Sequence, residues 1–373
     1  MGFAPRTATL LLRSWHGSGP SAVLEYLHTL AEPLTRPAGP VGGGADGEAG
    51  LAGDLLDAHP AVHALDCLLE YAASQALADG EMPDEVLGLI ADALAAHPGD
   101  GAVADAIGAY LPVLHRRATA FTAAHPELYV LDPHRPSSTA GWLRGPGLDP
   151  LLLAALDRSQ LLAVMRANLS GATLRVACAL MDGHHDLLGD PAAAWSELAT
   201  GPGGAEAASY LLMTLALLTP QRPYAGDAVP DPAARTTVDV AHLWWTAALD
   251  ADLPPGALAG AGHFADALPD EVWLPLARRS AEHTPALDNA DKVAERAAGH
   301  PRSPDALLLT GHLLIRPAPD PEYDTDVRRH ARTLLQAAAA LPEAERPAQE
   351  EQLRRALVEA GEVDLAQTLM TAG

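Results

Sequence analysis

The chain has 373 residues, of which 48% are hydrophobic, and it carries a formal net charge of −24 with a pI of about 4.9. This length and apolar content allow one elongated repeat domain or about two to three compact domains. Because the chain repels phosphate and contains a single lysine, Lys292, the composition argues against binding to nucleic acid or to an anionic membrane surface.

No segment at the N-terminus or elsewhere is long and apolar enough to suggest a signal peptide or a membrane span. The first apolar run is closed by Arg13, and no run approaches the length of a typical spanning helix. The two cysteines lie in apolar helical patterns, which is typical of small buried side chains. We therefore expect a cytoplasmic protein. No sequence motif indicates a cofactor, since phosphate-binding and dinucleotide-binding glycine patterns are missing.

Composition divides the chain into five parts. These are N-terminal helices at 1–32, a flexible Pro/Gly linker at 33–50, a first helical array at 51–126, an irregular loop at 127–148, and a central and C-terminal helical array at 149–373. The linker has no hydrophobic periodicity, so it cannot bury enough surface to offset its chain entropy. In the irregular loop, Tyr129–Leu131 is the one candidate for a short strand. Alternating β-branched runs are otherwise missing, which predicts an all-α fold.

The central stretch begins with a clear helix start at Asp149–Pro150, where an N-cap carboxylate precedes a proline at the first helical position. Asp157–Ser159 is expected to divide this stretch into two helices. A further helix at 171–181 is apolar on nearly every face except at Arg175. Such a helix is normally covered on more than one side, so we place it in the middle layer of the protein.

Further helices are predicted from apolar spacing at the helical period and from their caps. They are expected at 103–110, 112–124, 191–199, 205–218, 236–249, 257–267, 270–282, 286–298, 305–315, 324–340, 343–360 and 362–371. His-Pro pairs at 59–60, 97–98, 125–126 and 300–301 are interpreted as helix ends, because the residue before proline avoids the helical region.

The sequence Pro-Asp-Glu-Val occurs at 83–86 and again at 269–272, so the two copies are separated by half the length of the chain. Four further positions match at the same offset, including Ala91 with Ala277 and Ala95 with Ala281. An ancient duplication explains these matches. The other explanation is a common type of helix start, with proline first and acidic residues in the first turn.

The C-terminal sequence ALVEAGEVDLAQTLM (Ala356–Met370) resembles the second half of a tetratricopeptide unit, with a small-residue helix, an Ala-Gly turn and an acidic cap. The earlier helix pairs, separated by prolines, are similar to HEAT-type units. These resemblances imply an irregular, α-solenoid-like helical-repeat array of antiparallel helix pairs that binds a protein on a concave surface. The chain departs from the tetratricopeptide pattern because the aromatic and glycine signature of that family does not recur along it at the family's period.

One cluster, His184, His185 and Asp186, has side chains that could ligate zinc, iron or manganese. A metal site needs three or four converging ligands, and adjacent residues usually point apart, so the remaining ligands would come from other parts of the chain. The alternative is an ordinary loop just after a helix end.

Six tryptophans are present among few aromatics, and Trp142, Trp195, Trp244 and Trp245 are the candidates for a binding surface. Helix packing is the competing interpretation. Taken together, the sequence predicts a non-enzymatic adaptor or regulator that binds another protein, and the negative charge favours a basic partner. The alternative is an all-α enzyme, with or without a metal, acting near His184, His185 and Asp186.

Overall fold

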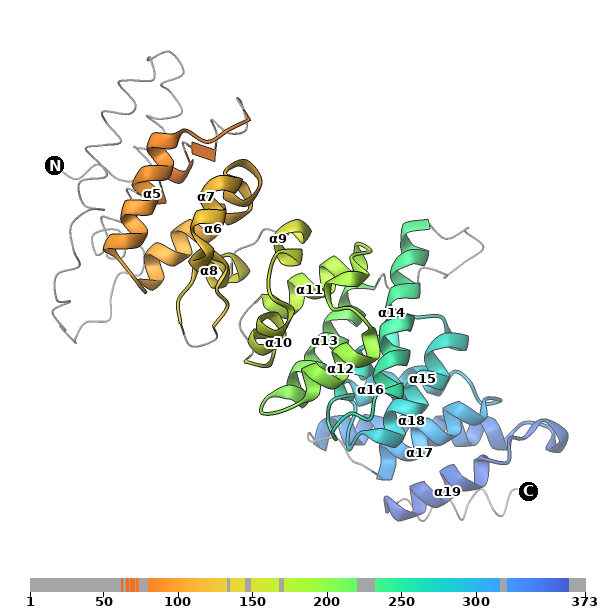
Figure 1. Cartoon of the computed structure of the whole chain (residues 1–373). Coiled ribbons are helices and arrows are strands. Elements are labelled where there is room, and N and C mark those ends of the chain that lie inside the picture. Colours follow the sequence, from red (N-terminus) through yellow and green to blue (C-terminus); the bar gives the residue numbers. More distant parts are fainter. Residues whose placement is uncertain are drawn as a thin grey trace, which may run out of the picture. The chain divides into compact units, whose positions relative to one another are not determined.

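The computed structural model describes residues 80–361 except 133–134, 145–148, 168–170, 220–231 and 316–320, together with 62, 65, 66, 68–70, 72 and 73. Throughout these residues the regular structure is helical and contains no strand, which confirms the predicted all-α fold (Figure 1). Within the same residues, no helix is both long enough and apolar enough to cross a membrane. The predicted elements at 1–32, 33–50 and 362–371 lie outside the described residues.

Two compact units make up the chain. The first comprises Met1–Val164 with Leu169–Gly171, and the second comprises Met165–Asn168 with Ala172–Gly373. The division between them falls inside the array predicted at 149–373.

The first unit contains seven described helical elements. These are α5 (Asp84–Ala96), α6 (Gly101–Arg117), α7 (Thr119–Ala124), η2 (Pro126–Tyr129), α8 (Ser138–Arg144), α9 (Pro150–Ala154) and α10 (Arg158–Arg166), which ends at the division. His97 and His125 are the C-caps of α5 and α7, so these two His-Pro pairs end helices as predicted. Asp149 caps α9, and its carboxylate accepts a hydrogen bond of 3.1 Å from the Leu152 amide.

Helix α6 continues through Pro112, so the prediction of separate helices at 103–110 and 112–124 is wrong. Proline inside a helix costs about 3 kcal/mol, because it lacks an amide hydrogen and crowds the preceding turn. Ile107, Leu111 and Leu114 are each fully buried on one face of α6. Burial of each such side chain contributes about 1.5–3 kcal/mol, so the packed face outweighs the local cost of the proline.

The segment predicted as an irregular loop at 127–148 contains η2 and α8, so this expectation is also corrected. Helix α8 crosses α6 at two glycines. A Cβ atom at Gly108 would lie 2.3 Å from the Ser138 carbonyl oxygen, and one at Gly141 would lie 2.7 Å from the Asp105 Cα. The glycines that suggested a loop in the sequence instead allow two backbones to approach closely.

The second unit contains α11 (Ala172–Met181), η3 (His185–Leu187), α12 (Pro191–Ala199), α13 (Gly204–Leu218), α14 (Pro232–Asp250), η4 (Ala259–Asp266), α15 (Asp270–His283), α16 (Ala290–Ala297), α17 (Pro304–Ile315), α18 (Pro321–Ala339), η5 (Glu343–Glu345) and α19 (Glu350–Glu359). As predicted, α11 is largely buried, and it packs against both α13 and α14. Arg175, the polar exception in the sequence, is buried as well.

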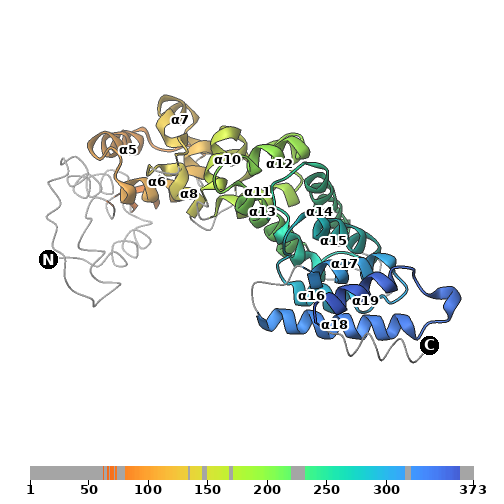
Figure 2. The ribbon, with the colours of Figure 1, turned by 90° about the horizontal axis from the view of Figure 1, so that it is seen from below.

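The longer helices of this unit form two layers that alternate along the chain. In one layer α11 contacts α13, α13 contacts η4, η4 contacts α16 and α16 contacts α18. In the other, α12 contacts α14, α14 contacts α15, α15 contacts α17 and α17 contacts α19. We call these layer A and layer B. Figure 2 shows α12, α14, α15 and α17 following one another beside α13, α16 and α18.

Three predicted helices of this unit differ in the structure. The segment at 257–267 is the 3-10 helix η4, whose Gly260 and Gly262 lie directly against neighbouring backbone. The segment at 343–360 divides into η5 and α19, because Pro347 separates them. Helix α16 begins at Ala290 instead of residue 286, since Asn289 adopts a left-handed conformation with φ of 51°.

The two Pro-Asp-Glu-Val sequences both start helices, with Pro83 and Pro269 as the N-caps of α5 and α15. The matched positions that follow have different environments. Ala95 is exposed in α5, whereas Ala281 is 3% exposed in α15. The structure therefore favours a common helix start over a preserved repeat at these positions.

Candidate functional site

The cluster of His184, His185 and Asp186 lies in the turn that ends α11 and in η3. The His184 amide donates to the Ala179 carbonyl at 3.0 Å and the Gly183 amide donates to the Leu180 carbonyl at 3.0 Å. This is the hydrogen-bond pattern of a Schellman motif, with Gly183 in the left-handed conformation at φ of 94°. The motif directs the chain away from the helix, and all three side chains of the cluster are exposed.

No group of three or more histidine, cysteine, aspartate or glutamate side chains in the described part of the chain is placed to hold a metal ion. Of the histidines elsewhere that could supply a ligand, His263 lies beside Asp288 and Asn289, and His312 lies beside Glu282. An enzyme acting at His184, His185 and Asp186 stays a prediction.

The four tryptophans that were candidates for a binding surface lie in the core, and each is at most 2% exposed. The Trp195 ring meets the Trp244 ring edge to face at 6.0 Å, and its indole nitrogen donates to the Trp244 carbonyl at 2.8 Å. Trp245 stacks on Phe264 at 4.5 Å, and its indole nitrogen donates to the Ser280 hydroxyl at 2.9 Å. Trp244 and Trp245 thus anchor α14 to its neighbours on two sides. Trp142, in the first unit, is a core residue of α8.

Cys178, on α11, is the one cysteine whose side chain the structure describes. Burial raises the pKa of its thiol, and the negative charge of Asp182 raises it further. A catalytic cysteine needs a lowered pKa. This thiol is therefore not activated as a nucleophile.

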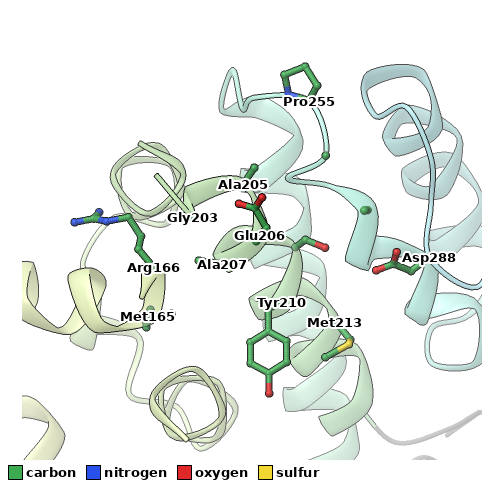
Figure 3. Close-up of a pocket in the computed structure, with 13 residues that line it drawn as sticks. Met165, Arg166, Gly203, Ala205, Glu206, Ala207, Tyr210, Met213, Pro255 and Asp288 are labelled. Atoms are coloured by element: carbon green, nitrogen blue, oxygen red, sulfur yellow. The ribbon is translucent and has the colours of Figure 1, made fainter. Parts of the chain in front are cut away.

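The second unit has a cavity of about 580 Å³ on layer A (Figure 3). Its lining comes from the end of α10, from α13, from the start of η4 with the loop before it, and from Asp288. The lining residues are Met165, Arg166, Gly203, Ala205, Glu206, Ala207, Ser209, Tyr210, Met213, Pro255, Gly256, Ala259 and Asp288.

Close backbone contacts fix the walls of this cavity. A Cβ atom at Gly260 would lie 2.0 Å from the Ser209 carbonyl oxygen, so only glycine lets η4 approach α13 this closely. The Gly260 amide donates to the Ser209 hydroxyl at 2.9 Å. The Asp288 amide donates to the Ala259 carbonyl at 2.9 Å, which holds Asp288 beside the first turn of η4.

The charged side chains of the cavity are unequally available to a ligand. Arg166 donates to the Glu197 carbonyl at 2.9 Å, and Figure 3 shows its side chain pointing away from Glu206 and Asp288. Glu206 is exposed in the first turn of α13. Asp288 is 48% exposed and lies 3.9 Å from the His263 imidazole. The available charge in the cavity is therefore negative.

Apolar surface adjoins these carboxylates. Tyr210 is 42% exposed, and Met213 is partly exposed one turn further along α13. Glu206, Tyr210, Met213 and Leu217 follow one another at spacings of four, three and four positions, so they form one outward stripe on the helix. A cation with a long apolar stem can pair with a carboxylate while its stem lies along apolar side chains further along the helix.

This site was not predicted, and none of Glu206, Tyr210, Met213 and Asp288 was singled out in the sequence. Glu206 and Tyr210 on α13 were the available signal, because most of that helix is apolar. No sequence pattern marked Asp288 as a site residue, since its place in the cavity depends on contact with η4, an element earlier in the chain. No protein-family model, no curated protein and no solved structure matches the chain.

Proposed function

We propose that the chain is a helical-repeat scaffold, an adaptor or regulator that binds another protein. The observation that carries this proposal is the alternation of the second unit between layers A and B. Each of these elements packs against the element two positions away, and most also pack against a neighbour next to them along the chain. This nearest-neighbour packing is characteristic of α-solenoids, in which stacked helix pairs present an extended surface to a partner.

The spacing of the helices supports the same proposal. The layer A elements begin at positions 172, 204, 259, 290 and 321, so three of the four intervals are nearly equal and the interval from 204 to 259 is longer. The equal intervals are slightly shorter than the period of tetratricopeptide repeats, which with HEAT repeats recur at about 34 to 47 residues. Unequal helix lengths and one long interval account for the lack of a regular period in the sequence.

The exposed chemistry of layer A supports a protein as the partner. Two exposed aliphatic side chains, Leu174 and Leu217, lie on α11 and α13, the helix that also carries Tyr210. Protein interfaces commonly combine aromatic and aliphatic contacts at the centre with charged residues at the rim. The net charge of −24 favours a basic partner, because complementary charge accelerates association.

Site-specific photo-crosslinking tests the proposal. A photoreactive amino acid is placed at Tyr210 on layer A or, as the matched control, at Leu243 on α14 of layer B, where the side chain is 50% exposed. The expected result is a covalent adduct with the same protein in repeated experiments from position 210 and none from position 243. Equal labelling of many proteins from both positions would refute a specific binding role for layer A.

A further inference from the structure

We infer that the cavity on α13 is the anchoring pocket of the scaffold and that it receives a lysine or arginine side chain of the partner, next to an apolar partner residue. This inference rests on the proposed function and adds the chemistry of the recognised segment. The partner is a protein segment in an extended or helical form, not a nucleic acid or a membrane.

The first step of the argument is electrostatic. Glu206 and Asp288 line the cavity from two different segments, and the one cationic side chain of the lining, Arg166, is directed away from them (Figure 3). In the described residues Glu206 makes no ion pair, and Asp288 is near His263 only at 3.9 Å. A cation of the partner therefore meets two carboxylates whose charges are not already neutralised.

The second step concerns size and apolar surface. A volume of about 580 Å³ accommodates more than one side chain, within the usual range for ligand sites of about 300–1,000 Å³. The Tyr210 ring and the Met213 thioether provide apolar contacts for the methylene stem of lysine or arginine. Met165 and Pro255 add apolar atoms to the lining, which suits an adjacent apolar residue of the same segment.

The third step separates this pocket from other acidic surface. Glu271 stands in the first turn of α15 as Glu206 stands in the first turn of α13, and both are exposed. A reversal of charge changes the interaction with the helix dipole equally at both positions. Glu271 lines no part of the cavity. Glu271→Lys is therefore the control for Glu206→Lys, because it makes the same charge change in the first turn of a helix outside the cavity.

The experiment uses random peptides displayed on phage and selected against the full-length protein. Selected sequences are expected to contain a lysine or arginine beside an aliphatic or aromatic residue. Synthetic copies are expected to bind Glu206→Lys and Asp288→Lys about tenfold or more weakly than the wild type, and to bind Glu271→Lys as well as the wild type. Affinity is expected to fall as salt is raised. Circular dichroism confirms that the three variants keep their helix content.

Several outcomes would overturn the inference. These are selected peptides without a cation, peptides whose affinity is unchanged in Glu206→Lys and Asp288→Lys, and failure to select any peptide on the wild type above the level on Glu206→Lys. A specific adduct at position 210 combined with any of these outcomes would leave the scaffold role standing and remove only the pocket chemistry. Absence of that adduct would instead remove the binding role of layer A on which the inference rests.

Discussion

The crossing of α6 and α8 makes a sharp test of the fold, because two glycines of the first unit should respond oppositely to the same substitution. Gly88 is exposed within α5, and a Cβ atom there would meet nothing within 4 Å. Gly108 is buried within α6, and a Cβ atom there would lie 2.3 Å from the Ser138 oxygen and 2.6 Å from the Trp142 nitrogen. Gly88→Ala should stabilise the protein and Gly108→Ala should destabilise it.

The magnitudes follow from two opposing effects. Alanine is favoured over glycine in a helix interior by about 0.8–1 kcal/mol, and this gain applies at both positions. At Gly108 the new methyl group would lie far inside the 3.4 Å at which ordinary contacts with backbone atoms begin, so α6 and α8 must separate. Overpacking of this kind costs about 1–3 kcal/mol. The two variants should therefore differ in free energy of unfolding by about 1–3 kcal/mol, since the helix gain is common to both.

Urea unfolding followed by circular dichroism measures this difference, and hydrogen exchange of peptides from α6 and α8 assigns it to the first unit. Local assignment matters because the chain has two compact units, which need not unfold together. If Gly108→Ala proved as stable as Gly88→Ala, the close crossing of α6 and α8 would be incorrect.

Three further predictions concern the second unit. Ser280→Ala should lower the free energy of unfolding by about 1–3 kcal/mol, because it leaves the buried Trp245 indole N–H without its acceptor. In a double-mutant cycle measured by urea unfolding, Trp245→Phe combined with Ser280→Ala should lower it by less than the sum of the two single changes. Arg296→Met should cost about 2–4 kcal/mol by the same assay, since the guanidinium lies 4.4 Å from the Trp273 ring and donates to carbonyls at the end of η4. Burial lowers the pKa of His330 in the folded state, and the charge of Arg329 lowers it further. Protonation of His330 therefore favours unfolding, and the free energy of unfolding should fall as the pH drops below about 6.5. In His330→Gln, the urea midpoints at about pH 7 and pH 5.5 should differ less than in the wild type.

Local sequence signals were sufficient for most helix starts. Asp149 and Asp190 cap α9 and α12 as their positions before proline indicate, and Asp157 separates α9 from α10. These signals succeed because a capping carboxylate satisfies amides only a few positions further along the chain. The result does not depend on tertiary packing.

Predictions failed where distant contacts decide the structure. Pro112 was expected to end a helix, but buried side chains on the opposite face of α6 keep it continuous. Gly141 was predicted to lie in a loop, but it is a helical residue whose missing side chain lets the backbone at Asp105, far earlier in the chain, approach closely. Trp142 and Trp245 were candidates for a surface, and their burial depends on partners such as Ser280 that no short-range pattern identifies.

The cavity lies where the spacing of the layer A elements is least regular. In an array of stacked pairs, each helix needs apolar faces only toward its neighbours, so helix and loop lengths can vary without loss of packing. The longest interval in layer A separates the starts of α13 and η4, and the loop containing Pro255 and Gly256 lies within it. This loop lines the cavity, and Asp288, from the loop before α16, completes the lining on the other side of η4. In repeat proteins, insertions of this kind commonly form the binding face. If the second unit is the helical-repeat scaffold that we propose, its longest interval is therefore also the one that contributes a loop to the candidate site on α13.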